Sequence, residues 1–585
     1  MEKSEFYVLN SCYNGSIGRA ECSADISMII ENKQDVLNSL ENKGYITDDF
    51  HITEKGRAAL KPYRVDNAVI LAAGASSRFI PLSLERPKGL FEVKGERLIE
   101  RQIRQLQDAG IKDITVVIGY KKEMFYYLRE QFGVNLIVNE SFNIKNNIES
   151  LYQARDHLKN TYVCVSDSFF VDNPFQQYEY DTFYAGIETN EQTNEMYVQV
   201  DDNNLIKKMM KGCEEGKIVF GHSFWKKEFS DRFIQLASED RTVGNYNSAF
   251  WEWLVRDNLE TMPPMYFKQY RSDSVFEFDY FEDLRKFDEQ YLGNTHSNII
   301  RNIKLIFRCD EEDIKNFRNV SEGLTNTSFI FKIDGKDYIY RHPGDGTEEI
   351  INRKNEKTSL IEAKKLNVDP TYIYEDVNEG WKISEYITDF REPDYDSFED
   401  SKKVLYVMRK VHNSGIVVDY GLNPWKESNR IESLLEEKSP GCFAQYKQLK
   451  QKIERLVMKT ENDGVQPCFC HGDTYKPNWM IRPDGSVVLI DWEYSGMSDP
   501  GIDVGYYIVD AMYDFETADL FIREYLQETT TPKMIFHFMA YVAIIAYYWF
   551  VWALYRESCG ASMPEVISNW HEMAKEYADY LCKDN

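Results

Sequence analysis

The chain has 585 residues, more than one hydrophobic core usually supports, so we expect two to four domains. Apolar residues make up 43% of it, which excludes a largely disordered or low-complexity protein. The formal net charge of −27 disfavours general affinity for nucleic acids or anionic membranes, because both need a basic protein surface.

The ten cysteines are scattered along the sequence. The closest pair, Cys468 and Cys470, is spaced too tightly for a C-x-x-C metal motif. We therefore expect reduced thiols and a cytoplasmic protein. No basic region followed by an apolar stretch opens the sequence, so we expect no secretory signal.

Residues 1–65 are predicted to form a small domain of short helices followed by a hairpin. A helical stretch at 36–40 precedes two extended stretches at 44–47 and 52–57. This order resembles the winged helix of the MarR-like kind. A DNA reader would carry basic residues on the helix and wing, whereas here acidic residues stand there, so a structural or regulatory role is favoured: Asp35, Glu41, Asp48 and Asp49.

Residues 66–292 alternate between strand and helix patterns. A buried strand is predicted at 68–71, a helix at 98–106 and a second strand at 114–119. Strands that alternate with helices form largely parallel sheets covered on both faces. We therefore expect a doubly wound, Rossmann-like α/β domain here, followed by a linker at 293–298.

The turn after the first of these strands has a phosphate-binding pattern. Its backbone N–H groups can surround triphosphate oxygens, and Arg78 and Lys88 supply positive charge for catalysis. The turn, the Pro87-Lys88 pair and the following helix together resemble the nucleotidyltransferases that activate sugars and phosphocholine. A purely structural turn is the alternative. The resemblance implies these nucleotide-binding residues: Leu71, Ala73, Gly74, Arg78, Lys88 and Asn147.

Within that superfamily, the best resemblance is to the bacterial phosphocholine cytidylyltransferases, carried by residues 146–151, 166–168, 221–225 and 277–279. The resemblance implies CTP as a substrate and a set of Mg²⁺ ligands. A metal ion held there would offset charge during an in-line displacement. The implied ligands are Asp167, Glu277 and Asp279.

Two positions depart from that family. Val165 replaces the first Asp of an Asp-x-Asp pair, and Met196 replaces an aromatic residue expected to contact a quaternary ammonium. Other aromatic residues are candidates to contact the substrate instead, although such residues are more often plain core. The candidates are Tyr197, Trp225 and Trp251.

Residues 299–585 begin with a strand-rich stretch and continue as helices. Strands predicted at 329–333 and 338–341 are joined by a turn that contains Gly335, which is typical of a hairpin. After residue 402 the pattern is mostly helical. We therefore expect a kinase-like domain with a small sheet-rich lobe followed by a helical lobe.

The stretch from His471 to Asp491 has the residues needed for phosphoryl transfer from ATP. An Asp beside the acceptor hydroxyl accepts its proton, and an Asn five residues later and a second Asp bind Mg²⁺. The spacing resembles the choline kinase and aminoglycoside phosphotransferase family over about residues 300–585. The resemblance implies Asp473 as the base, His471 as a positioning residue, and Asn478 and Asp491 as metal ligands.

The same resemblance implies the ATP-binding residues. Thr325 and Asn326 would belong to the loop over the phosphates. Arg341 stands in place of the phosphate-pairing lysine, with Glu356 as its helix partner. The adenine-binding hinge would include Glu385 and Ile387.

Choline is favoured over an aminoglycoside as the acceptor. Trp549 and Trp552 lie on one face of a predicted helix, followed by Tyr555, and Glu493 supplies a counter-charge. Each aromatic face attracts a quaternary ammonium by roughly 0.5 to 2 kcal/mol, although core packing is the alternative for both tryptophans. The charge-free run 534–555 is long enough to span a bilayer, but its polar aromatic residues favour a buried helix.

Together these features predict a bifunctional enzyme that makes phosphocholine from choline and ATP, and CDP-choline from phosphocholine and CTP. One alternative keeps both reactions but uses ethanolamine or another amino alcohol, in keeping with Met196. Another is a DNA-binding regulator that senses these metabolites through degenerate catalytic domains, which the intact Asp473 and Lys88 disfavour. We expect no nucleic-acid or membrane partner, and the sequence leaves the oligomeric state open.

Overall fold

The computed structural model describes residues 1–13, 33–213, 215–244, 246, 249–278, 280–293, 295–320, 327–343, 352–438, 441–558 and 563–583. The chain divides into two compact units, Met1–Glu312 and Asp313–Asn585. Helix α13 (Asn298–Phe307) falls in the first unit, whereas the predicted kinase-like domain began at residue 299. The exact domain boundaries stay predictions.

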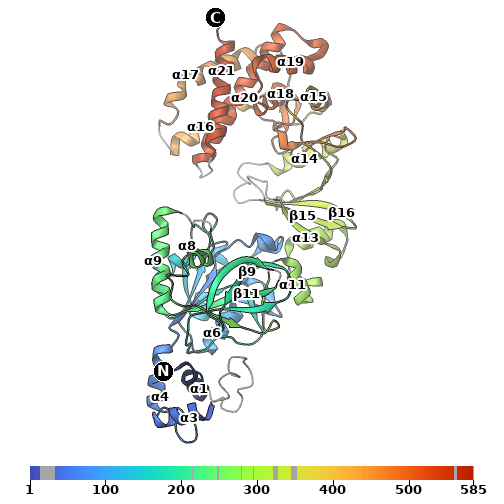
Figure 1. Ribbon diagram of the computed structural model, residues 1–585. Helices are drawn as coiled ribbons and strands as arrows, with labels where there is room; N and C mark the ends of the chain where they lie inside the picture. The colour runs from blue at the N-terminus through green and yellow to red at the C-terminus, as the bar shows by residue number, and fades with distance from the viewer. Residues whose placement is uncertain are drawn as a thin grey trace. The chain divides into compact units, whose positions relative to one another are not determined.

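The first unit begins with helices and continues as an α/β fold (Figure 1). Its elements are α1 (Lys3–Tyr13), α3 (Lys33–Asn42), α4 (Glu54–Leu60), β1 (Asn67–Ala72), α5 (Leu82–Glu85), β2 (Glu92–Val93), β3 (Glu96–Arg97), α6 (Leu98–Asp108), β4 (Ile114–Ile118), α7 (Tyr127–Phe132), β5 (Asn135–Val138), α8 (Asn147–Gln153), β6 (Thr161–Val165), β7 (Ser168–Phe170), β8 (Phe183–Thr189), β9 (Thr193–Val200), β10 (Ile206–Cys213), β11 (Gly216–Trp225), α9 (Lys227–Val243), α10 (Trp251–Asp257), β12 (Tyr266–Gln269), β13 (Val275–Glu277), α11 (Phe281–Phe287), α12 (Gln290–Gly293) and α13.

The central sheet of this unit has the strand order β10-β9-β11-β6-β1-β4-β5. Strand β1 is parallel to both β4 and β6, whereas β11 is antiparallel to β6. Val69 and Leu71 of β1 pack with α8 and α9 on one face, and Ala68 and Ile70 pack with α6 and α7 on the other. Both faces of the sheet are therefore covered by helices, which confirms the predicted Rossmann-like domain.

The N-terminal segment contains α1, α3 and α4 around one small apolar cluster. The expected hairpin is present among the described residues as a single pair, Ile46 and Ile52. Thr53 accepts a hydrogen bond from the N–H of Gly56 and so begins α4 at Glu54, where the sequence predicted a strand. The winged-helix assignment stays a prediction.

The second unit contains a five-stranded antiparallel sheet and a helical part. Its elements are β14 (Lys315–Val320), β15 (Thr327–Ile333), β16 (Lys336–His342), α14 (Arg353–Lys365), β17 (Tyr372–Glu375), β18 (Lys382–Glu385), α15 (Phe398–His412), α16 (Pro424–Lys438), α17 (Lys447–Thr460), β19 (Cys468–Cys470), β20 (Trp479–Ile481), β21 (Val487–Leu489), β22 (Gly496–Ser498), α18 (Gly501–Asp510), α19 (Phe515–Leu526), α20 (Pro532–Ser558) and α21 (Pro564–Leu581).

The predicted hairpin of this unit is confirmed as β15 and β16, which pair antiparallel. Its turn consists of Asp334 and Gly335, whose φ angles are +50° and +80°. Two consecutive left-handed residues form the tight turn whose twist suits a two-residue hairpin. The Asp-Gly sequence therefore sets the register of these strands.

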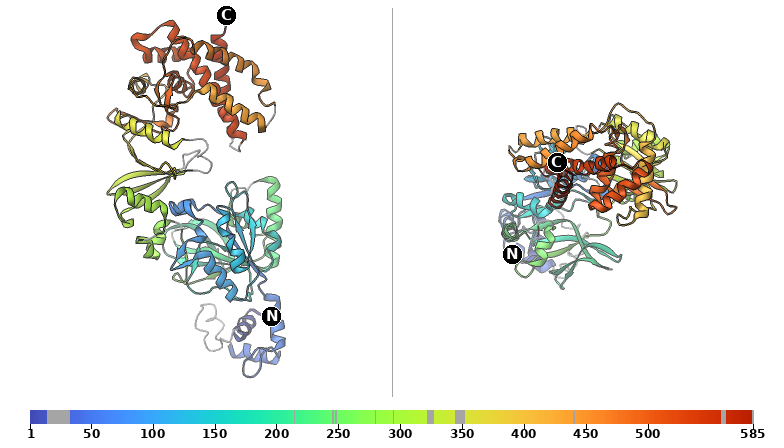
Figure 2. Two further views of the ribbon diagram at one scale, coloured as in Figure 1. Left: turned by 180° about the vertical axis from the view of Figure 1, so that it is seen from behind. Right: turned by 90° about the horizontal axis from the view of Figure 1, so that it is seen from above.

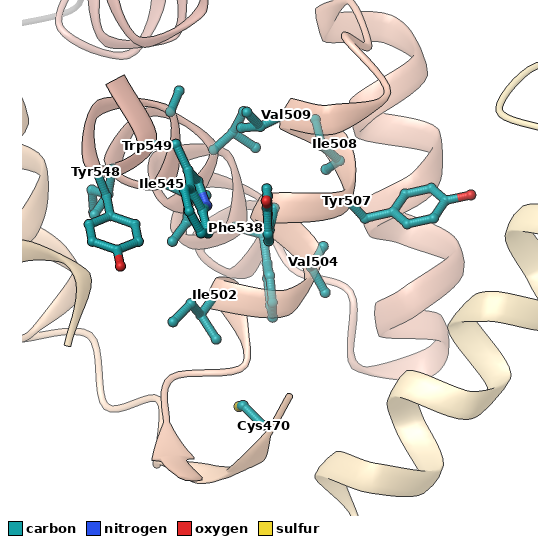
Figure 3. Close-up of a cluster of buried hydrophobic side chains, with 14 of the residues drawn as sticks. Cys470, Ile502, Val504, Tyr507, Ile508, Val509, Phe538, Ile545, Tyr548 and Trp549 are labelled. Carbon is teal, nitrogen blue, oxygen red and sulfur yellow. The ribbon is translucent and has the colours of Figure 1, made fainter. Parts of the chain in front are cut away.

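Helix α20 is the central helix of the helical part. It packs against α16, α17, α18, α19 and α21, and the red C-terminal helices lie side by side in both views of Figure 2. Figure 3 shows Phe538 and Ile545 of α20 meeting Ile502 and Val504 of α18. Although α20 is long and apolar enough to cross a membrane, 78% of its most apolar window is buried inside the unit. This supports the prediction of a buried helix.

His537 of α20 is fully buried between two carboxylates. Its Nδ1 lies 2.5 Å from Asp463 and its Nε2 lies 2.8 Å from Asp499. Burial alone would lower the pKa of His537, but the hydrogen bonds and charges of Asp499 and Asp463 outweigh it and raise that pKa. The stabilising effect of the charged ring is therefore complete below pH 6.5 and is lost as the pH rises through the pKa of the folded state.

We expect His537→Gln to lower the stability of the second unit by roughly 2 kcal/mol near pH 6, because a charged hydrogen-bond partner is removed. The difference in stability between the unaltered chain and His537→Gln should become smaller between pH 7 and pH 9. Melting temperatures of the full chain at pH 6 and pH 9 measure this. The control is His571→Gln, which removes a histidine packed on Tyr446 and Phe550, and its effect should not narrow in this way. A difference for His537→Gln that is constant over this pH range would contradict the assignment.

Candidate active sites

A cavity of about 340 Å³ lies at the carboxyl ends of β1 and β6 in the first unit. In sheets of this kind, ligands bind outside the carboxyl ends of the parallel strands. The structure brings most of the predicted nucleotide-binding residues together there. Those that line the cavity are Leu71, Ala73, Gly74, Lys88, Asn147 and the predicted metal ligand Asp167.

Lys88 and Asp167 form a buried ion pair in this cavity. The Lys88 Nζ lies 2.8 Å from Oδ2 of Asp167, and the Lys88 side chain is only 8% exposed. The other oxygen of Asp167, Oδ1, is buried and has no hydrogen-bond partner among the described residues. A buried carboxylate oxygen without a partner is a suitable ligand for a hard divalent cation.

The other predicted residues of this site differ in position. Glu277 ends β13 and is paired with Ser168 of β7, directly after Asp167, so the backbones of the two predicted metal ligands lie close together. Arg78 is exposed, and its guanidinium lies 5.9 Å from the ring centre of Tyr280. Asp279 lies outside the described residues. The metal-ligand and catalytic roles of these residues stay predictions.

The predicted substrate-binding tryptophans of the first unit are core residues. Trp225 is fully buried against Phe233 and Trp251, and Trp251 packs on Tyr184 with ring centres 5.0 Å apart. Tyr197 lies on β9 with its hydroxyl against the sulfur of Met210. The packing of Trp225 and Trp251 therefore agrees with the alternative that they are plain core, whereas Tyr197 is half-buried.

Glu252 was missed by the sequence analysis. Its Oε1 accepts a hydrogen bond of 2.9 Å from the Tyr184 hydroxyl, and its Oε2 is buried with no partner among the described residues. Burial raises the pKa of Glu252 to about 7, and the charge of Glu195 adds to the shift. Its position after Trp251 in a Phe-Trp-Glu-Trp run was the available signal. A carboxylate beside aromatic rings can pair with a cationic substrate group.

In the second unit, β19 leads into the loop that carries the predicted base. Asp503 of α18 accepts hydrogen bonds from the backbone N–H groups of His471 and Gly472, at 2.8 and 2.7 Å. The amide of Asn478 donates to Oδ2 of Asp473 at 3.0 Å. The structure thus brings His471, Asp473 and Asn478 together. Asp503, which the sequence analysis did not identify, holds the loop in place through its two hydrogen bonds to the backbone.

Asp473 is a buried carboxyl poised to exchange a proton near neutral pH. Burial raises its pKa to about 7, and the charge of Asp491 adds to the shift. Tyr506 of α18 favours the charged form of Asp473 and stacks on Trp549, with ring centres 4.7 Å apart. Tyr506, another residue absent from the predicted site, therefore connects the candidate base to an aromatic surface.

That aromatic surface includes Trp549, a predicted substrate-binding residue, and adjoins a second one, Trp552. Trp549 is 5% exposed and meets Trp552 edge to face, with ring centres 5.3 Å apart. Tyr494 also meets Trp549 edge to face. The ring of Tyr555 contacts Lys438 instead, with the ammonium 4.7 Å from the ring centre. Trp549 is therefore linked to Asp473 through Tyr506, and Tyr494 packs on Trp549.

A cluster of opposite charges surrounds Arg341 of β16. Arg341 donates to Glu356 at 2.7 Å, as predicted, and also lies 3.4 Å from Asp491 and 3.5 Å from Glu493. Lys382 of β18, which the sequence analysis missed, lies 3.0 Å from Glu356. Although burial would raise the pKa of Glu356, Lys382 and Arg341 hold it well below its ordinary value.

Glu493 belongs to this charge cluster. Ligand oxygens of Glu356, Asp491 and Glu493 all lie within 4.8 Å of one another. Burial raises the pKa of Glu493 to about 8, and the charge of Asp491 adds to the shift. The contacts of Glu493 are therefore with Arg341 and Asp491, the predicted phosphate-binding and metal-binding residues, and its role as a counter-charge for the acceptor stays a prediction.

The adenine-binding and loop residues are only partly described. Glu385 ends β18, and its N–H donates to the carbonyl of Thr371. Ile387 follows two residues later and is half-buried. Thr325 and Asn326 lie outside the described residues.

Comparisons with known proteins identify both parts of the chain. Residues 68–195 match the family model of the MobA-like NTP transferase domain, and residues 317–547 match that of choline/ethanolamine kinase. The choline-phosphate cytidylyltransferase of Streptococcus pneumoniae is 32% identical over 222 residues, which cover 38% of this chain and 96% of that protein. The chain belongs to the choline-phosphate cytidylyltransferase family and carries a choline/ethanolamine kinase domain.

Two further relatives match this fusion protein. The 2-aminoethylphosphonate cytidylyltransferase of Lancefieldella rimae is 30% identical over 230 residues, covering 39% of this chain and 93% of that protein. Protein LicA of Haemophilus influenzae is 26% identical over 250 residues, covering 40% of this chain and 92% of that protein. The fusion therefore joins two parts that each match nearly the whole length of a separate protein.

We expect Lys88→Met to slow nucleotide-dependent pyrophosphate release by about 100-fold, because it removes the buried cation of the cavity. The kinase reaction of the same variant should be unchanged. An assay for released pyrophosphate measures the first reaction, and an assay for ADP measures the kinase reaction. Lys122→Met is the matched control, since Lys122 pairs with Glu140 and does not line the cavity. Undiminished pyrophosphate release by Lys88→Met would exclude the role of Lys88.

Proposed function

We propose that this chain phosphorylates choline with ATP and then transfers CMP from CTP to the resulting phosphocholine, giving CDP-choline and pyrophosphate. The observation that carries the proposal is Tyr506, which favours the charged form of the candidate base Asp473 and stacks on Trp549. An acceptor whose ammonium lies against these rings has its hydroxyl group within reach of the base. The family membership of the first unit supplies the second reaction.

In the kinase step, Asp473 accepts the proton of the choline hydroxyl as its oxygen attacks the γ-phosphorus of ATP. The bond between that phosphorus and the β,γ-bridging oxygen breaks, and ADP leaves. Asn478 orients Asp473 through the 3.0 Å hydrogen bond to Oδ2. Arg341 and Lys382 supply positive charge for the phosphates.

In the cytidylyl transfer, a phosphate oxygen of phosphocholine attacks the α-phosphorus of CTP. The bond to the β-phosphate breaks, and pyrophosphate leaves without a covalent enzyme intermediate. Lys88 offsets the charge that builds up on the phosphates. Glu252, which accepts a hydrogen bond from Tyr184, is a candidate partner for the ammonium group.

Both sites have residues that fit Mg²⁺. Asp167 with its unpartnered oxygen, together with Glu277, would hold it in the first unit. Asn478 and Asp491 would hold it in the second. When bound, Mg²⁺ neutralises phosphate charge and makes the phosphorus a better target for attack.

The alternative substrate is an amine with N–H donors, such as ethanolamine. It is favoured by one relative that is named for 2-aminoethylphosphonate and by the family name of the kinase domain. Glu252 has a buried oxygen that could accept from such a donor. The regulator hypothesis required degenerate sites, whereas the cavity around Lys88 and the loop around Asp473 keep their charged groups paired and buried.

We expect Asp473→Asn to abolish phosphocholine formation and leave CDP-choline formation from added phosphocholine intact. Asp167→Asn should do the reverse, because each change removes a carboxylate from one site only. Products of choline, ATP, CTP and Mg²⁺ can be followed by mass spectrometry. The proposed function fails if the unaltered chain makes neither product.

We expect Trp549→Leu to raise the KM for choline by about 2-fold to 30-fold, the equivalent of 0.5 to 2 kcal/mol of cation–π attraction. The KM for ATP should stay constant. Trp549→Phe keeps an aromatic face and serves as the matched control, with a smaller change expected. A higher kcat/KM for ethanolamine than for choline in the unaltered chain would favour the alternative substrate.

A further inference from the structure

The first residues of the catalytic loop are preceded by two thiols that neither proposed reaction uses. Cys468 and Cys470 occupy the ends of β19 and, being two residues apart on a strand, face the same side. Their sulfur atoms lie 3.6 Å apart. Both are free cysteines, Cys470 buried and Cys468 half-buried. Cys470 is labelled beside the α18 and α20 core in Figure 3.

His412, at the end of α15, completes a cluster with these thiols. A nitrogen of its ring and both sulfurs lie within 4.8 Å of one another. The Nε2 of His412 lies 2.9 Å from Asp503, and its Nδ1 lies 2.7 Å from the hydroxyl of Tyr525. The ring is therefore held by a carboxylate on one side and by a neutral, exchangeable group on the other.

The spacing of the sulfurs matches joint coordination of one metal ion. Two thiolates bound tetrahedrally to Zn²⁺ at about 2.3 Å have their sulfurs about 3.8 Å apart. A disulfide would need about 2.05 Å. The observed 3.6 Å is close to the first value and far from the second.

We propose that Cys468, Cys470 and His412 form a Zn²⁺ site in the second unit. Sulfur and imidazole ligands select Zn²⁺ over Mg²⁺, whose sites in this chain are made of oxygen ligands. Zinc-binding histidines usually donate their second N–H to a carboxylate, and Asp503 stands in that place. The site would tie β19 to α15 directly behind the catalytic loop.

The electrostatic surroundings differ among the three ligands. Burial raises the pKa of the Cys470 thiol well above its ordinary value, so a metal ion must displace its proton. A hydrogen bond with Cys470 and the charge of His412 lower the pKa of Cys468, although burial opposes the shift. Burial lowers the pKa of His412, but the hydrogen bond and charge of Asp503 outweigh it and raise that pKa. A metal ion must therefore displace a proton from His412, while the Cys468 thiolate forms more readily than usual.

The test uses the purified full chain, stripped with a chelator and titrated with Co²⁺ and then Zn²⁺ in excess Mg²⁺. We expect one Co²⁺ per chain with an intense near-ultraviolet band from thiolate-to-cobalt charge transfer, and loss of that band when Zn²⁺ is added. Cys468→Ser should lose the band and bind Zn²⁺ at least 10-fold more weakly. Cys442→Ser changes a half-buried cysteine outside the cluster and should behave as the unaltered chain does.

Stability gives a second readout that does not depend on activity. Zn²⁺ should raise the melting temperature of the second unit, by an amount that grows with the logarithm of its concentration. His412→Gln should lose this shift even if it lowers the starting stability. The proposal is overturned if Cys468→Ser binds Zn²⁺ as tightly as the unaltered chain, or if bound Co²⁺ shows no thiolate band. Because neither readout uses choline or nucleotides, its failure would leave the proposed function untouched.

Discussion

A buried carboxylate is stable only where nearby groups replace the hydrogen bonds that water would give, and Asp503 in α18 meets this requirement with three donors. Two are the backbone N–H groups of His471 and Gly472, and the third is His412. Burial would raise the pKa of Asp503, but its contacts with His412 and His471 lower it. The carboxylate stays charged and joins α15, α18 and the catalytic loop, so the position of Asp473 depends on it.

The shape of that loop depends on a second constraint. Gly472 has a φ of +85°, and a Cβ added there would lie 2.5 Å from the carbonyl oxygen of Tyr494. Only glycine avoids both the strained backbone and the collision. Gly472 therefore lets the loop pass close to Tyr494, which in turn faces Trp549. The loop with Asp473 and the aromatic residues can be adjacent because Gly472 has no side chain.

Features encoded in a few consecutive residues could be predicted from the sequence. The strand that became β1, the helix that became α6 and the hairpin of β15 and β16 follow from apolar periodicity and from the Asp334-Gly335 turn. The same holds for the loop from His471 to Asn478, whose residues act at fixed spacing. The boundaries of segments depend on contacts that a pattern does not show. The side chain of Thr53 accepts a hydrogen bond from the N–H of Gly56, and α4 begins there instead of the predicted strand.

Groups that meet only after folding could not be predicted in this way. Lys382, Asp503 and Tyr506 contribute to the kinase site from separate elements, and no local motif marks them. Two aromatic residues show the opposite case, because they were predicted to contact the substrate and are buried in the core. Trp225 and Trp251 are types that suit an ammonium site, but whether they face a ligand or the core depends on which side of the sheet they occupy. Burial of that kind is a property of the whole fold.

The two sites share a way of keeping cations in an acidic protein. Lys88 pairs with Asp167, and Arg341 pairs with Glu356 and approaches Asp491, so each phosphate-binding cation is already matched by a carboxylate. A cation buried without a partner would be costly, and the net charge of −27 would repel free nucleotides. Asp167 and Asp491 are also the predicted metal ligands. A divalent ion held by Asp167 or Asp491 would compete with Lys88 or Arg341 for that carboxylate and would leave more of the positive charge available to a phosphate.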